Sequence, residues 1–331
     1  MANDLIVTGS GTNIPLANFR NVFHAQEVQR RLDKLPEKDH DNLRTVYERM
    51  IERGPERFQV KPSSIPEMES LYEQMPNFTE ALDEVRRQLA LALDCHDGIQ
   101  MTPTLLLGPP GIGKTHFAKK LADLLGTGMN LVPMSSMTAG WLLSGSSSQW
   151  RGAKPGKVFE TLVDGQYANP VIVVDEVDKA ACDTQYDPLG AMYSLLEHDT
   201  AKQFVDEFAE VAIDASQVIW VLTANDERAI PKPIMNRMNV FEVIPPTRDQ
   251  ARTVARKLYT SIRESHGWGK RFNSEPSADL LDRLAEIGPR EMRRSLLRGF
   301  GDARLEGSDT VTPHHLGKKD ARRSSIGFTA S

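Results

Sequence analysis

The feature that most restricts this chain is the octapeptide GPPGIGKT, Gly108–Thr115, which fits the pattern G-x-x-x-x-G-K-[ST]. Its glycines let the backbone curl so that successive N–H groups point at phosphate oxygens. An apolar run, TLLL, precedes the loop and a helical pattern follows it, so a purely structural glycine turn is the weaker interpretation. The loop predicts a nucleotide-binding α/β fold.

Two side chains of this loop have expected roles in chemistry. Lys114 is predicted to reach the β- and γ-phosphates, and the Thr115 hydroxyl to hold Mg²⁺. The helix that follows adds its positive N-terminal end. We therefore expect ATP and Mg²⁺ as cofactors. The predicted ATP-binding set is Gly108, Pro109, Pro110, Gly111, Ile112, Gly113, Lys114, Thr115 and His116.

A second apolar run, VIVV, ends in two carboxylates, Asp175 and Glu176. Ligands bind at the carboxyl ends of strands in open α/β sheets. Asp175 is predicted to contact Mg²⁺, directly or through water, and Glu176 to take a proton from the attacking water. A strand followed by a solvated acidic turn is the alternative, and the phosphate loop makes it the weaker one.

Two further polar residues stand downstream. Asn225 ends the run VIWVLTAN, where its amide would orient the water; a loop-capping asparagine is the structural alternative. Arg237 follows two prolines on an expected short helix, and its permanent charge and planar fork suit phosphoryl transfer. From the residues alone, a surface arginine is the commoner interpretation of Arg237.

Short apolar runs alternate with helical patterns in the middle of the chain, which predicts a parallel sheet with helices on both faces. The stretch DPLGAMYSLLEHD is expected to be one helix. We predict four regions: a helical N-terminal prelude (1–78), an α/β nucleotide-binding core (79–245), a small α-helical domain (246–312) and a disordered basic tail (313–331).

Bulk properties exclude several classes of protein. A net charge of -5 gives no general affinity for polyanions. Cys95 and Cys182 lack metal-ligand spacing, and the adjacent His314 and His315 lack a third ligand at suitable spacing. The N-terminus does not have the pattern of a secretory signal, and no apolar run approaches the roughly 18 residues of a membrane span. We expect a cytoplasmic protein without membrane association.

The motifs GPPGIGKT, VVDEVDK, TAND, NRM and GPREMRR occur in the order found in AAA+ ATPases, and the chain is identified as a member of that family. From about residue 80 to about residue 305 it resembles the ATPase module of Lon proteases. The stretches QWRGAKPGKV, YDPLGAMYSLLEHD and TANDERAIPKPIMNRM carry this closer likeness. The resemblance implies an AAA+ P-loop NTPase core with a small α-helical lid domain.

By this resemblance Asn225 is sensor 1, Arg237 is an arginine finger and Arg290 is sensor 2. Together with Glu176, they form the predicted catalytic set. An arginine finger acts on the nucleotide of a neighbouring subunit, so the resemblance implies a homo-oligomeric ring, usually a hexamer in this family. The expected activity is Mg²⁺-dependent ATP hydrolysis, and the expected partner is a protein substrate.

The resemblance also assigns a pore. Trp150 falls where Lon-type rings carry the aromatic residue of the first pore loop, which grips a threaded polypeptide through apolar contact. Arg151 follows, where Lon proteases usually have an aliphatic residue, and Tyr186 is assigned to a second pore loop. Without the resemblance, packing of Trp150 on its own domain is the preferred interpretation. The residues after the lid are too few to fold a peptidase domain, so we expect no peptidase activity.

Three functions stay open at this point. The first is a motor that remodels or unfolds proteins. The second is a nucleotide-switched loader or scaffold that acts on DNA or a protein complex. The third is the unfolding subunit of a separately encoded peptidase, with or without an adaptor. Contact with nucleic acid is the less favoured idea, because the basic stretch ARKLYTSIRESHGWGKRF is expected to be a solvated lid helix.

Overall fold

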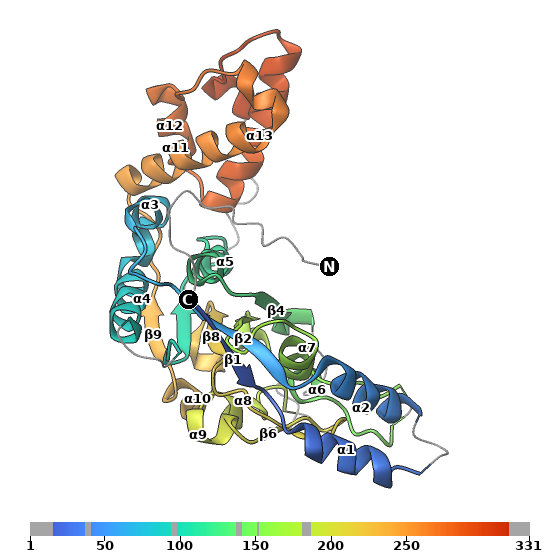
Figure 1. Ribbon diagram of the computed structural model, residues 1–331. Coiled ribbons are helices and arrows are strands. Elements are labelled where there is room, and N and C mark those ends of the chain that lie inside the picture. Colours follow the sequence, from blue (N-terminus) through green and yellow to red (C-terminus); the bar gives the residue numbers. More distant parts are fainter. Residues whose placement is uncertain are drawn as a thin grey trace. The chain divides into compact units, whose positions relative to one another are not determined.

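The computed structural model describes residues 16–36, 41–93, 98–136, 141–150, 152–180 and 187–317 of the chain (Figure 1). These residues form two compact units. The first unit takes the described residues up to Met68, with Phe78–Gly108 and Lys114–Val243. The second takes Glu69–Asn77, Pro109–Gly113 and the described residues from Ile244 onward. Four residues singled out above, Cys95, Cys182, Arg151 and Tyr186, lie outside the described residues.

The first unit is built on a parallel sheet that has five strands in the described residues, in the order β4-β5-β8-β3-β9. They are β3 (Thr104–Leu107), β4 (Met129–Pro133), β5 (Val171–Asp175), β8 (Ile219–Ala224) and β9 (Asn239–Glu242). Every residue from Val171 to Val174 is buried. Because successive side chains of a strand point to opposite faces, both faces of the sheet are covered, and the predicted α/β fold is confirmed.

The remaining elements of the first unit surround this sheet. The helices are α1 (Ala25–Lys34), α2 (Asp41–Arg53), α4 (Thr79–Ala92), α5 (Lys114–Leu125), α6 (Trp141–Ser144), α7 (Lys157–Val163), α8 (Met192–Leu195), α9 (His198–Ala201) and α10 (Lys232–Met235). Short 3₁₀ turns are η2 (Met134–Ser136), η3 (Val177–Lys179) and η4 (Glu227–Ala229), and η1 (Pro76–Phe78) lies where the chain passes between the units. Two antiparallel pairs complete the list: β1 (Leu16–Asn21) with β2 (Glu56–Lys61), and β6 (Phe204–Val205) with β7 (Ala212–Ile213).

The antiparallel pair of strands β1 and β2 contradicts the prediction of a helical prelude. The two strands pair from Leu16 with Lys61 to Asn21 with Glu56. The Asn169 side chain holds β2 in place, because it accepts a hydrogen bond from the Val60 N–H at 3.0 Å and donates one to the Val60 carbonyl at 2.7 Å. Asn169 is more than a hundred residues away from β2 along the chain, so no local sequence pattern predicts this strand.

The first two helices also belong to the first unit. The Tyr47 hydroxyl of α2 donates to the Ala209 carbonyl at 2.8 Å, and Arg49 forms an ion pair with Asp164 at 3.0 Å, just beyond α7. Figure 1 shows the blue helices α1 and α2 on the same side of the unit as α6 and α7. Residues of both helices, such as Val28 and Met50, lie in the same hydrophobic core as the sheet.

The stretch DPLGAMYSLLEHD forms two short helices, α8 and α9, instead of the single helix that the sequence predicts. Glu197 separates them in an extended conformation, with φ -111° and ψ 126°. The break turns the chain so that Leu195, Leu196 and Ala201 are all buried. Tertiary burial therefore overrides the local helical preference here.

The second unit is helical, as predicted for the C-terminal part of the chain. It comprises α3 (Glu69–Gln74), α11 (Arg248–Ser265), η5 (Gly267–Arg271), α12 (Ala278–Leu284), α13 (Pro289–Leu305) and η6 (Pro313–Leu316). Its core holds Tyr259, Phe272 and Phe300, and the Phe300 ring lies 5.0 Å from Tyr259 and 4.9 Å from Phe272 between centroids. Within the described ranges, every helix is too short or too polar to span a bilayer.

Candidate active site

The phosphate-loop sequence forms the curled turn that it predicts. The Gly108 N–H donates to the Ala224 carbonyl at 3.1 Å, which ties the start of the loop to β8. Gly111 (φ +81°) and Gly113 (φ +107°) adopt the left-handed conformation that a side chain would strain. Lys114 begins α5 directly after this turn. Of the other predicted loop residues, Pro109, Pro110 and His116 are exposed, Ile112 is buried and Thr115 is half-buried.

Lys114 is buried and faces the end of β8. Its Nζ donates to the Gly108 carbonyl at 2.5 Å and to Oδ1 of Asn225 at 2.9 Å. Burial lowers the pKa of Lys114, while the nearby charges of Asp178, Asp175 and Glu176 oppose that shift. The structure thus brings Lys114 and the predicted sensor Asn225 into direct contact. Asp178, whose side chain is fully buried, is an acidic neighbour that the sequence analysis did not single out.

The two predicted Mg²⁺ ligands lie together at the carboxyl end of β5. The Thr115 hydroxyl donates to Oδ1 of Asp175 at 3.0 Å. Hydroxyl and carboxylate oxygens are the ligands that Mg²⁺ prefers, so this pair fits the ion that the sequence predicts. A second hydroxyl, of Thr223, donates to the same Oδ1 at 2.6 Å.

Glu176 follows Asp175 in a left-handed conformation, with φ 56° and ψ 50°. Such values are uncommon for a residue with a Cβ atom and cluster at functional sites. The Glu176 N–H donates to the Thr223 hydroxyl at 2.9 Å, and Thr223 is only 1% exposed. Sequence analysis missed Thr223, although its place at the end of an apolar strand two residues before Asn225 was a usable signal.

Arg237 lies at the opposite edge of the sheet. It stands after α10 and two residues before β9, which starts at Asn239 beside Pro103. β9 runs parallel to β3, so Arg237 is at the amino ends of these strands, whereas the phosphate loop follows the carboxyl end of β3. Four residues of strand span ~13 Å. The structure therefore does not bring Arg237 to the phosphate site of its own chain.

Three groups hold the Arg237 guanidinium. Its Nε forms an ion pair with Oε1 of Glu197 at 2.7 Å, and one terminal nitrogen donates to the Pro233 carbonyl at 2.6 Å. The guanidinium carbon lies 5.8 Å from the centre of the Tyr193 ring. Arg237 and Glu197 also line a cavity of about 480 Å³, together with Trp220. The sequence analysis did not single out Glu197 or Tyr193.

Arg290 is the second residue of α13 and is exposed. Within the second unit it lies near Gly111, since a Cβ added to Gly111 would be 3.9 Å from the Cβ of Arg290. The predicted sensor 2 residue therefore neighbours the tip of the phosphate loop.

Trp150 stands on a closed turn and is 48% exposed. The Ser146 N–H donates to the Lys154 carbonyl at 3.2 Å, and the Lys154 N–H donates to the Ser146 hydroxyl at 3.1 Å, so the base of the turn is pinned. The edge of a second indole, Trp141, meets Trp150 with 5.6 Å between centroids and 86° between planes. Trp141 was missed in the sequence. Both rings are exposed, so Trp150 does not lie in the core of its own unit.

A buried carboxylate anchors this turn. Asp206 accepts hydrogen bonds from the N–H groups of Gly156 at 2.8 Å, Phe208 at 3.0 Å and Ala209 at 3.0 Å. Burial raises the pKa of Asp206 to about 6, against the effect of these three donors. A Cβ at Gly145 would lie 2.8 Å from the Asp206 carboxylate oxygens. Asp206 thus binds one end of the segment that carries Trp150, at Gly156, and lies closely packed against the other end, at Gly145.

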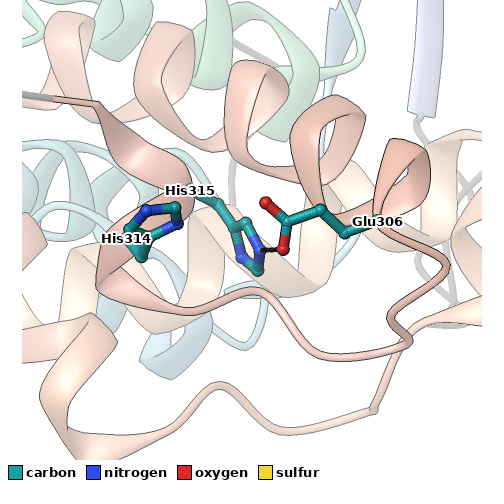
Figure 2. Close-up of side chains that lie close together, drawn as sticks. All are labelled: Glu306, His314 and His315. Carbon is teal, nitrogen blue, oxygen red and sulfur yellow. Dashed lines mark hydrogen bonds and ion pairs between the residues drawn. The ribbon is translucent and has the colours of Figure 1, made fainter.

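In the folded structure the adjacent histidines His314 and His315 lie close to the carboxylate of Glu306. Figure 2 shows the His315 ring between His314 and Glu306. One possible ligand atom from each of the three residues lies within 4.8 Å of the others. The His315 Nδ1 accepts the Thr312 N–H at 2.9 Å, so its Nε2 carries the proton and donates to Glu306 at 2.9 Å. The Nδ1 contact caps the start of η6, and the Nε2 contact reaches Glu306 at the end of α13, so both ring nitrogens of His315 already have partners within the protein.

Comparisons with known proteins agree with this geometry. Residues 104–246 match the model of the ATPase family associated with various cellular activities (AAA). Lon protease 2 of Hydrogenovibrio crunogenus is 32% identical over 58% of this chain and 22% of its own length. Lon protease of Clostridioides difficile is 34% identical over 58% of the chain and 25% of its own length. The peroxisomal Lon protease homolog 2 of Arabidopsis thaliana is 28% identical over 82% of the chain and 32% of its own length.

The chain thus spans between 22% and 32% of the length of these three curated relatives. Among solved structures, a closed-state Hsp104 with ATPγS and FITC-casein matches with a TM-score of 0.58. That match has 18% sequence identity and covers 85% of this chain and 51% of Hsp104, so it supports the fold alone. From the ordered motifs, the parallel sheet and the matched relatives, we conclude that residues 104–246 form an AAA-family ATPase domain and that this region resembles the ATPase module of Lon proteases.

Proposed function

We propose that this chain hydrolyses Mg²⁺-ATP in a ring of identical subunits, a hexamer by analogy with the family, and uses the cycle to remodel or unfold protein substrates. One observation carries the proposal. Lys114, Asp175 and Asn225 lie at the carboxyl edge of the sheet, while Arg237 lies at the amino edge of the same sheet. A site that needs all of these groups is complete only when a second copy supplies the arginine.

The chemistry follows from the side chains at the carboxyl edge. Phosphate oxygens would replace the Gly108 carbonyl and Asn225 as partners of Lys114. Thr115 and Asp175 would hold Mg²⁺, which neutralises charge on the phosphates when it is bound. Glu176 acts as the general base on the attacking water, and Asn225, released by Lys114, orients that water.

The two arginines complete the transition state from outside this cluster. Arg237 of the neighbouring copy would contribute roughly 10³ to 10⁵ in rate, because it meets charge that develops during phosphoryl transfer. Arg290, next to Gly111, would report the nucleotide state to the helical lid, the region 246–312 of the predicted division. This division into regions and the cytoplasmic location stay predictions.

The substrate side of the proposal concerns the exposed indoles. Trp150, with Arg151 beside it and Tyr186 on a second loop, would line the pore and grip a protein chain. The pinned turn and the exposure of Trp150 and Trp141 support this role. A loader acting on DNA, and an unfolding subunit for a separate peptidase or its adaptor, are the competing outcomes.

Mixed assemblies test the ring. Lys114→Ala and Arg237→Ala should each reduce ATP hydrolysis about 10³-fold on their own. An equal mixture should recover about a quarter of wild-type turnover, because a quarter of randomly formed contacts join an intact phosphate loop to an intact arginine. Subunits of the same variant mixed with each other are the control. A mixture no more active than its components, or a fully active Arg237→Ala protein, contradicts the proposal.

A second experiment identifies the substrate. Glu176→Gln should bind ATP without turnover and keep its partner in place. Captured protein that is lost on Trp150→Ala supports threading. Stimulation of the ATPase by DNA with unchanged activity of Trp150→Ala supports the loader, and a co-purifying peptidase supports the protease subunit.

A further inference from the structure

Thr223 contacts both acidic residues of the active site, Asp175 at its carboxylate and Glu176 at its backbone N–H. It lies on β8, one residue before the strand ends, and its side chain is 1% exposed. Its hydroxyl donates to Oδ1 of Asp175 at 2.6 Å and accepts the Glu176 N–H at 2.9 Å. A threonine hydroxyl has one proton and two lone pairs, so both contacts are made at once and their directions are set.

These two contacts act on different parts of the site. The bond to Asp175 reaches the same oxygen that accepts the Thr115 hydroxyl at 3.0 Å, so two hydroxyls orient one carboxylate. The bond from Glu176 captures a backbone N–H in a residue with φ 56°. Because the backbone of Glu176 turns here against its preference, this N–H would point elsewhere in a relaxed conformation, and the side chain would move with it.

We propose that Thr223 is a positioning residue for ATP hydrolysis, which aims the Glu176 carboxylate at the attacking water and holds Asp175 in one orientation. It acts through these two residues and makes no contact with the nucleotide itself. The proposal rests on the roles of Asp175 and Glu176 in the proposed function. The orientation of the Glu176 carboxylate matters more in the transition state than in the complex with bound ATP, so the loss of Thr223 should lower kcat.

The experiment compares Thr223→Val with Thr223→Ser. Valine keeps the branched shape and removes the hydroxyl, whereas serine keeps the hydroxyl. For Thr223→Val we expect kcat to fall about 10- to 100-fold, the size that follows from losing one or two buried hydrogen bonds. KM for ATP and the affinity for a fluorescent ATP analogue should change less than about twofold, because the substitution removes no binding group. Thr223→Ser should keep kcat within about threefold of the wild type.

Thr104→Val is a matched control. Thr104 is also buried in the same sheet, but it lies at the amino end of its strand, β3, away from the phosphate loop. Its hydroxyl donates to the Thr102 carbonyl at 3.3 Å. It should leave kcat unchanged. If Thr223→Val fails to fold, Thr223→Ala gives the same comparison with Thr223→Ser.

The possible results distinguish the positioning role of Thr223 from the proposed role of Glu176 as the general base. An unchanged kcat in Thr223→Val, a loss that serine does not rescue, or a parallel loss of kcat and ATP affinity overturns the positioning role. Full turnover in Glu176→Gln overturns the base assignment instead. A purely structural role predicts a lower melting temperature with equal effects on kcat and KM, and a similar loss in Thr104→Val.

Discussion

Replacing Glu176 with glycine should stabilise the first unit and abolish ATP hydrolysis at the same time. Glu176 has φ 56° and ψ 50°, a conformation in which its Cβ crowds the backbone. Glycine has no Cβ and adopts these angles freely. The hydrogen bond from the residue-176 N–H to Thr223 does not involve the side chain, so it stays in place.

The size of the gain follows from two opposing effects. The left-handed region costs an L-residue roughly 1–2 kcal/mol. Glycine loses more conformational freedom on folding, which removes about 0.5–1 kcal/mol of that gain. The net increase in the free energy of unfolding is about 0.5–1 kcal/mol, or ~2–3 °C in melting temperature for a unit of roughly 150–250 residues.

The assay is thermal unfolding without nucleotide, beside the rate of ATP hydrolysis. Glu176→Gln is the first control, because it removes the carboxylate and keeps the strain. Glu210→Gly is the second: Glu210 is the other described residue besides glycine with a positive φ, at 52°, and it lies away from the phosphate loop. It should gain similar stability with full turnover. A Glu176→Gly protein no more stable than Glu176→Gln refutes the idea that strain is stored at the proposed base.

Three further predictions concern residues around the site. Asp206→Asn should remove one pH-dependent contribution to the free energy of unfolding. Burial raises the pKa of Asp206 from 3.8 to about 6, so its contribution is fully present below about pH 4 and falls by on the order of 2–3 kcal/mol as the pH rises through 6. Urea unfolding of both proteins at pH 4.5 and 7 measures this difference. Glu197→Gln should lower turnover at most about fivefold, because a part-exposed ion pair is worth up to ~1 kcal/mol, and a loss as large as that of Arg237→Ala would contradict a supporting role. Trp141→Ala should weaken substrate stimulation of the ATPase without changing the basal rate, since it removes an edge contact of ~1 kcal/mol from Trp150; full stimulation would exclude Trp141 from the gripping surface.

Local chemistry explains what could be predicted from the sequence. The octapeptide Gly108–Thr115 adopts its curled turn because glycine tolerates the required backbone angles, a property of the residues themselves. The strands β3, β5 and β8 are continuous apolar runs, so their burial was foreseeable. The polar residues that follow these strands were bound to gather at one edge, since parallel strands end together.

Contacts between distant segments explain what was missed. Thr223 meets Asp175 across 48 positions of sequence, and Trp141 meets Trp150, which lies on the turn that the bonds between Ser146 and Lys154 close. The strand β9 is short and half-exposed, without an apolar run to mark it. The separation of Thr223 from Asp175 is too large for a local sequence pattern to contain both residues.

The sequence by itself determined which groups are present for triphosphate chemistry and which of them follow a strand. Only the tertiary structure decided that Lys114 contacts Asn225 and Thr115 contacts Asp175 at the carboxyl edge of the sheet, whereas Arg237 stands at the amino edge. The reason is direction. A residue that follows a strand and a residue that precedes the next parallel strand are close in sequence, but they lie a full strand length apart in space.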